Sequence, residues 1–136
     1  WRIFLQALES RSPIDNDAAR TAGLEAAGKS SQLSVHAIMV LSELGELDAA
    51  FSIVDGLVMR RGPNLSQFRS EEGQSPAQDP QWRQTQWLFT PATERLRADS
   101  RFVALTEAIG LAEFWRRRGI EPDEGLPRAD NRVSSL

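Results

Sequence analysis

Two runs of apolar residues at helical spacing, separated by one glycine, constrain this chain more than any other feature. In the run from Leu33 to Leu44, apolar side chains fall on nearly every side of the expected helix. A helix of this kind is packed on several sides, so it should be the most buried one. The run from Leu47 to Val58 is apolar along one face. Gly45 lies between the runs and permits a tight reversal, which predicts an antiparallel helical hairpin.

Helical spacing continues on both sides of this hairpin. Further helices are expected at residues 1–8, 18–27, 91–96, 99–109 and 111–119. Ser12-Pro13 breaks the pattern after the first of these, and the residues 15–17 are N-cap candidates for the second. Ser30 or Ser31 should cap the central helix, and Asp99 a later one. No stretch alternates with period two, so the predicted fold class is all-α.

Loop signals divide the chain further. Residues 62–80 contain few apolar side chains and several prolines and glycines, which predicts a long mobile loop inside a helical domain of residues 1–119. Residues 120–136 are expected to form a mostly disordered tail. The chain starts at Trp1 within a helical pattern, so we expect a C-terminal fragment of a larger protein.

Composition narrows the class of protein. The 136 residues carry a net charge of −3, which argues against nucleic-acid binding, because that needs a basic face. Without cysteine and with one histidine, thiolate zinc sites and multi-histidine metal sites are excluded. Lys29 is the only lysine among 16 basic residues, a bias typical of GC-rich bacterial genomes. No apolar run is long enough for a membrane span.

The hairpin from Leu33 to Arg61 carries four matches to a known repeat. They are an apolar residue, an inter-helix glycine, a small alanine and a later apolar residue, at Leu41, Gly45, Ala50 and Leu57. In these positions the chain resembles a tetratricopeptide unit, although Ile38 stands where that family has a small residue. The resemblance implies helical hairpins stacked as a short right-handed solenoid or bundle.

The segment from Pro91 to Asp123 carries a second set of matches. They are Leu96, Arg97, Asp99, Arg101, Phe102, Gly110, Leu111, Trp115, Gly119, Pro122 and Asp123. This segment looks like the closing part of bacterial tetratricopeptide-containing signalling proteins, of the adenylate-cyclase or winged-helix regulator type. Ser100 replaces the family's proline and Phe114 its tyrosine. The resemblance implies a fold and a chain end, and it names no ligand.

One motif indicates a different function. Gly23, Gly28, Lys29 and Ser30 match the phosphate-binding pattern G-x-x-x-x-G-K-S. That site would need a strand before Gly23 and a loop whose N–H groups face the phosphates. The intervening residues 24–27 are strong helix formers, so we interpret the motif as a helix that ends at Gly28, followed by a helix that Ser30 caps. A nucleotide-binding protein that uses this motif remains the alternative.

Other chemistry-bearing residues have structural explanations. His36 has no nucleophile or orienting acid fixed near it in sequence. Glu43, Glu46 and Asp48 are read as a solvated turn. The arginines at 116–118 are read as the end of a last helix, where they satisfy its final carbonyls. No catalytic, metal or cofactor residue is predicted, and the protein is not expected to be an enzyme.

The predicted function is protein–protein interaction, as a regulatory scaffold module. The first helix of each hairpin should line a groove, which would expose the polar residues of the central helix, Ser34, His36, Ser42 and Glu43. The spacing separates Ser34 and His36 from Glu43, so these residues are not all expected on one narrow face. The partner would be a protein, a peptide or another domain of the parent chain, and a dimerisation module is a further alternative. We expect the cytoplasm rather than the periplasm.

Overall fold

A computed structural model describes residues 1–64 and 85–120 of the chain. In these residues it has seven α-helices, two short 3-10 helices and no strand, which confirms the all-α prediction for this part. The elements are α1 (Arg2–Ser10), α2 (Pro13–Ala27), α3 (Ser31–Leu44), α4 (Leu47–Leu57), η2 (Gln86–Phe89), η3 (Pro91–Thr93), α5 (Glu94–Ala98), α6 (Arg101–Ala108) and α7 (Leu111–Arg118). Most of the expected loop at 62–80 and of the tail at 120–136 lies outside the described residues.

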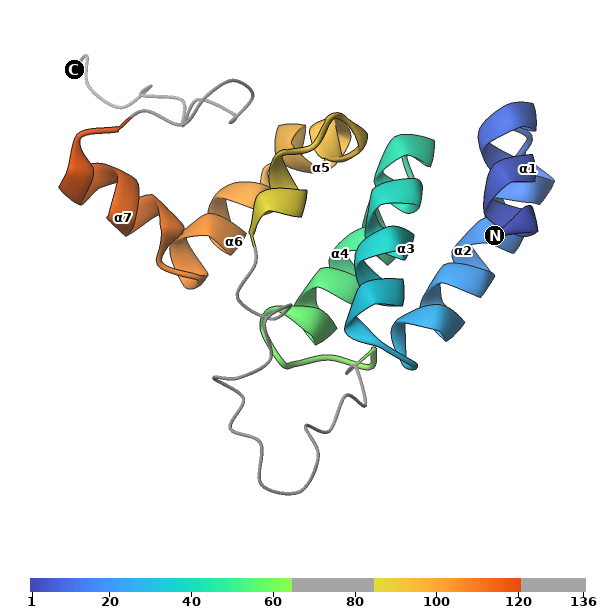
Figure 1. The fold of residues 1–136 in the computed structure, drawn as a ribbon, viewed down its shortest axis with the longest axis horizontal. Coiled ribbons are helices and arrows are strands. Elements are labelled where there is room, and N and C mark those ends of the chain that lie inside the picture. Colours follow the sequence, from blue (N-terminus) through green and yellow to red (C-terminus); the bar gives the residue numbers. More distant parts are fainter. Residues whose placement is uncertain (65–84, 121–136) are drawn as a thin grey trace, which may run out of the picture. The chain divides into compact units, whose positions relative to one another are not determined.

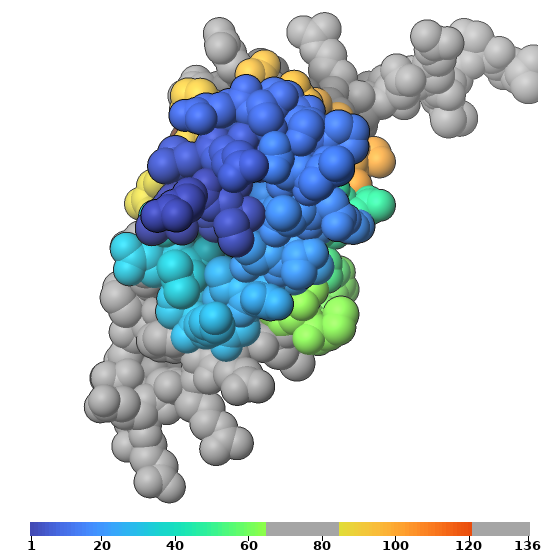
Figure 2. Space-filling view, turned by 90° about the vertical axis from the view of Figure 1, so that its right-hand side faces the viewer, coloured from blue at the N-terminus to red at the C-terminus, as the bar shows by residue number. Residues whose placement is uncertain are grey.

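The chain divides into two compact units, residues 1–96 and 97–136. In the first unit, α1 to α4 lie side by side in chain order, and each packs against the next (Figure 1). In addition α1 contacts α3, α2 contacts α4, and η3 packs on α3. Turns of two or three residues join the four helices, at 11–12, 28–30 and 45–46, so neighbouring helices are antiparallel. The face that α1, α2 and the start of α3 form together appears in blue to cyan in Figure 2.

The central hairpin forms as its cap residues predict. The Oγ atom of Ser30 accepts a hydrogen bond from the Leu33 N–H at 3.1 Å, and α3 begins at the next residue. At its other end Gly45 adopts a φ of 83°, and its N–H bonds back to carbonyls of the last turn. This left-handed conformation is the tight reversal that the glycine was expected to supply.

The α2 helix begins at Pro13, five residues before the predicted start at Ala18. The Oγ atom of Ser12 accepts a hydrogen bond from the Asp15 N–H at 3.2 Å and is the N-cap. Pro13 then occupies the first helical position, where a missing N–H costs nothing because that group has no partner inside a helix. The prediction was wrong because it took Ser12-Pro13 only as a break, although the same pair also starts a helix.

Asp15 ties the turn between α1 and α2 together. Its carboxylate accepts hydrogen bonds from the hydroxyls of Ser10 at 2.5 Å and Ser12 at 2.8 Å and from the Gln6 amide at 2.8 Å. The Ser10 bond, followed by that from Ser12, lowers the pKa of Asp15 below its ordinary value of 3.8. The ionised form is therefore the one that stabilises the fold.

This lowered pKa predicts a pH dependence. A carboxyl whose pKa is depressed in the folded state stabilises the fold fully above its unfolded pKa and loses that contribution as the pH falls through the folded pKa. We expect Asp15→Asn to lower the free energy of unfolding at pH 7 and to make little difference at acid pH well below 3.8. Urea unfolding across this range measures the difference, and Glu25→Gln on the exposed side of α2 is the control. A constant gap between wild type and Asp15→Asn at all pH values would contradict the assignment.

The core of the first unit lies between α1, α2, α3 and α4. Its fully buried apolar side chains include Ala27, Ala37, Ile38, Leu41, Ala50 and Ile53. In α3, 8 of 14 residues are buried, and in α4, 7 of 11. The fraction of buried residues is therefore higher in α4 than in α3, and the expectation that α3 is the most buried helix is wrong in this measure. The α3 helix does contact α1, α2, α4 and η3. The reason is that one side of α3 stays accessible.

The second unit is described from Arg97 to residue 120. Phe102 and Leu105 of α6 are its buried apolar residues. The Asp99 carboxylate accepts hydrogen bonds from the backbone N–H of Arg101 at 2.9 Å and from its guanidinium at 2.8 and 2.9 Å. The guanidinium bond is the main reason that the pKa of Asp99 lies below its ordinary value. Asp99 thus supports the start of α6, although the N-cap residue is Ser100 and not Asp99 as the sequence predicted.

Candidate functional site

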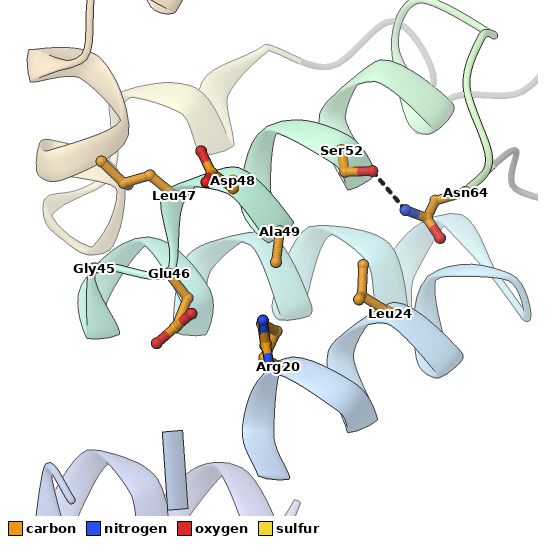
Figure 3. Close-up of a pocket in the computed structure, with 9 residues that line it drawn as sticks. All are labelled: Arg20, Leu24, Gly45, Glu46, Leu47, Asp48, Ala49, Ser52 and Asn64. Carbon is orange, nitrogen blue, oxygen red and sulfur yellow. Dashed lines mark hydrogen bonds between the residues drawn. The ribbon is translucent and has the colours of Figure 1, made fainter. Parts of the chain in front are cut away.

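A pocket of about 360 Å³ opens between α2 and α4 (Figure 3). Arg20 and Leu24 of α2 form one side, and the α3–α4 turn with the start of α4 forms the other. Asn64 contributes its side-chain amide, which donates a hydrogen bond to the Ser52 hydroxyl at 2.6 Å. None of the four residues predicted to bind protein lines this pocket. Residues 20, 24 and 64 are far apart in sequence, so no local pattern could have predicted that they meet.

Besides Leu33 and Val35, the accessible residues of α3 form a stripe along one face. Its members recur at steps of four, three and four residues, which places them on one face of a helix. They are Gln32, His36, Met39 and Glu43. Gln32 is exposed and the other three are partly exposed. The structure therefore brings His36 and Glu43 to the same face, and the expectation that helical spacing separates them is wrong.

Trp1 lies beside this stripe. Its ring centroid is 5.0 Å from that of the His36 imidazole, and the two rings meet edge to face. Trp1 is nevertheless 67% exposed, and Leu5, one turn further along α1, is 56% exposed. The Nδ1 atom of His36 is buried and has no hydrogen-bond partner in the described residues. From the sequence, residues 1–8 were expected only as a helix, and this apolar surface was not predicted.

Glu43, at the other end of the stripe, joins α3 to the α1–α2 turn. Arg11 donates to the Glu43 backbone carbonyl and to its carboxylate, each at 2.8 Å, and to the Leu8 carbonyl at 3.0 Å. Arg11 also has a positive φ of 53°, which is uncommon for a residue with a side chain. These three bonds hold the turn in that conformation, so Glu43 has a structural task besides its accessible position.

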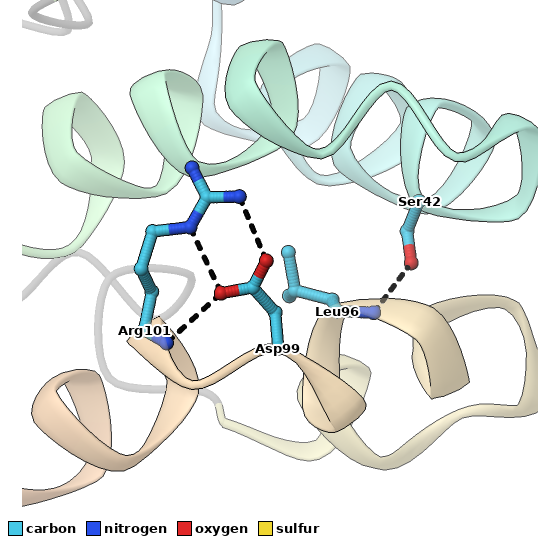
Figure 4. Close-up of polar contacts among 4 residues, drawn as sticks. All are labelled: Ser42, Leu96, Asp99 and Arg101. Atoms are coloured by element: carbon cyan, nitrogen blue, oxygen red, sulfur yellow. Dashed lines mark hydrogen bonds and ion pairs between the residues drawn. The ribbon is translucent and has the colours of Figure 1, made fainter.

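Ser34 and Ser42 lie outside this stripe on buried sides of α3, and each is 0% exposed. The Ser34 hydroxyl donates to the carbonyls of Ala27 at 3.0 Å and Ser30 at 2.9 Å. The Ser42 hydroxyl accepts from the Leu96 N–H at 3.2 Å, as drawn in Figure 4. The prediction that these two serines are exposed is wrong, because their hydroxyls satisfy backbone groups inside the fold.

The phosphate-binding motif does not form a strand and a loop. Gly23 lies inside α2, which continues to Ala27, and Gly28 ends that helix with an ordinary φ of −70°. A Cβ atom at Gly23 would lie 3.0 Å from the Leu41 Cδ1 atom, so this glycine permits the close approach of α2 and α3. The helix-and-cap interpretation of the motif is confirmed. Lys29 is exposed in the turn that follows α2.

This geometry gives a direct test for nucleotide binding. With residues 24–27 in helical hydrogen bonds, their N–H groups are not available to phosphates. We expect ATP with magnesium to leave the melting temperature of wild type and of Lys29→Ala unchanged. A ligand at one hundred times its Kd would stabilise the fold by about 2.7 kcal/mol, which is readily seen. A rise of that size, lost in Lys29→Ala, would contradict this interpretation.

The part of the chain that the structure describes lacks two further features. No group of three or more acidic, histidine or cysteine side chains in residues 1–64 and 85–120 is arranged to hold a metal ion. In the same residues, no helix has the length and apolar content that crossing a membrane requires.

No protein-family model matches the chain, and no curated protein or solved structure is similar enough to count as a match. The resemblance to tetratricopeptide proteins therefore rests on the matched residues alone. The helical content agrees with a helical repeat.

Proposed function

We propose that this chain is a protein–protein interaction module, a regulatory scaffold that binds its partner on the face of α1 and α3. The observation that carries the proposal is the exposure of Trp1 and Leu5 beside the stripe on α3. Large aromatic side chains at a surface are costly to leave in water and are the residues most often found at the centre of interfaces. Hydrogen bonds to His36 and Glu43 would orient the partner on this face.

The helix contacts support a tetratricopeptide-like arrangement as part of this proposal. In a stack of helical hairpins, the first helices of successive hairpins touch each other, and so do the second helices. The contacts of α1 with α3 and of α2 with α4 have this form. With α1 and α3 as first helices, the stripe from Gln32 to Glu43 lies in the layer that lines the inner surface of such solenoids.

The test is to select peptides that bind the chain from a displayed library and to map their sites by NMR. We expect the shift changes to fall on α1 and α3, including the Trp1 indole. We expect Trp1→Ala to weaken a selected peptide about thirtyfold, which is the usual loss at an interface anchor. Ile14→Ala is the control, because Ile14 is an 82% exposed apolar residue of α2 outside the stripe. Equal losses in both variants, or shifts confined to α4, would contradict the proposal.

A further inference from the structure

The last helix of the described chain, α7, has no buried residue. Phe114 is 49% exposed and Ile120, two residues beyond the helix, is 51% exposed. The helix also carries three arginines against one glutamate, Glu113. The exposed Phe114 ring beside excess positive charge makes this helix a surface to examine for a binding partner.

The three arginines of α7 have different surroundings. Arg116 donates to the Glu107 carboxylate of α6 at 2.9 Å, and Arg117 pairs with Glu113 one turn earlier at 2.5 Å. Arg118 lies instead over the Phe114 ring, 5.7 Å from its centroid. Among the described residues Arg118 has no carboxylate partner, so two of the charges are already neutralised and one is left open.

Stacking on an aromatic ring orders a guanidinium without using its hydrogen-bond donors. The planar guanidinium of arginine matches the two oxygens of a carboxylate. Because the side chain is already ordered, it loses less conformational entropy when it binds. Arg118 and Phe114 are one helical turn apart, so a cation and an exposed apolar ring stand side by side on one face of α7. The matching surface on a partner has a carboxylate and an apolar side chain one turn apart.

We propose that the Phe114–Arg118 pair of α7 is a docking site for an acidic amphipathic helix of a partner protein, with one partner carboxylate bound to Arg118 and an apolar side chain packed on Phe114. Charge favours this occupant over an anionic membrane. Each unpaired basic residue contributes roughly 1 kcal/mol to binding an anionic membrane, so stable attachment needs several of them. The α7 helix offers one, because Arg116 and Arg117 are already paired. This site lies in the second unit and does not depend on the face of α1 and α3 proposed above.

The experiment titrates the full chain with a synthetic helical peptide that has glutamate and leucine one turn apart, followed by NMR. We expect shift changes on α6 and α7 and a binding constant that weakens at high salt. Arg118→Gln should weaken binding about tenfold, as the loss of a charge-assisted hydrogen bond does. The matched control is Arg2→Gln, which removes the same charge from an exposed position of α1. It should change binding less than about twofold.

Reversing the charge of both partners distinguishes binding at Arg118 from non-specific attraction between the acidic peptide and the basic helix. Arg118→Glu should lose the glutamate peptide and bind a version with lysine in place of glutamate. The proposal is overturned if Arg118→Gln and Arg2→Gln behave alike, or if the shifts fall on α1 and α3. It is also overturned if vesicles of anionic phospholipid bind through α7 while the peptide does not.

Discussion

Replacement of Gly23 by leucine is expected to lower the free energy of unfolding by about 3 kcal/mol, the upper part of the range for overpacked cores. Gly23 is buried in α2, and the added Cβ alone would lie 3.0 Å from Leu41 Cδ1 and 3.5 Å from the Ala37 Cβ. A leucine has three further carbon atoms that must also find space between α2 and α3. Urea unfolding followed by circular dichroism measures the loss.

Gly28→Leu is the control for this substitution, because it changes the other glycine of the same motif. Gly28 has a φ of −70°, and an added Cβ would meet no heavy atom closer than the Glu25 carbonyl at 3.8 Å. We therefore expect its effect to stay within about 0.5 kcal/mol. A phosphate-binding loop would need both glycines, so equal losses at the two positions would count against the helical interpretation.

Truncation of Leu41 to alanine is expected to cost about 2–5 kcal/mol, since it removes a fully buried side chain and leaves a cavity. Leu41 lies on the side of α3 that packs against Gly23 of α2. The measurement is again equilibrium unfolding, with Leu33→Ala as the control, because Leu33 is an apolar residue of α3 that is 36% exposed. A similar loss at both positions would contradict the described packing of α3.

The two substitutions should also interact. A leucine at position 23 can occupy part of the space that Leu41→Ala vacates, because the Cβ of residue 23 points at that side chain. The double variant is then expected to lose less stability than the two single losses together, by about 1 kcal/mol or more. Additive losses would show that α2 and α3 do not meet at these residues.

The helices of the first unit were predictable where the signals are local. Ser30 and Gly45 each act through hydrogen bonds to groups within one turn, so their neighbours in sequence decide the outcome. The start of α2 was missed because Ser12-Pro13 has two local meanings, and the choice between them depends on the bonds that Asp15 makes across the turn. Where serine and proline precede a helical pattern, they should first be considered as the N-cap and first residue of that helix.

The candidate site was less predictable, because exposure depends on distant neighbours. Ser42 was expected at the surface, yet the Leu96 N–H, 54 residues away, covers it. Trp1 begins an apolar pattern at helical spacing, yet it is mostly exposed. Polarity alone indicated neither outcome. The positions on one helix face, such as His36 and Glu43, could have been derived from the seven-residue spacing between them.

The turns of two or three residues between α1 and α4 have a consequence for how the chain can change during evolution. Among α1 to α4, the main contacts join helices one or two places apart in chain order. Such short connections fix the pairings at little cost in loop-closure entropy. A hairpin can therefore be gained or lost at one end while the remaining pairings stay as they are, so the length of the binding face can vary independently of the core that supports it.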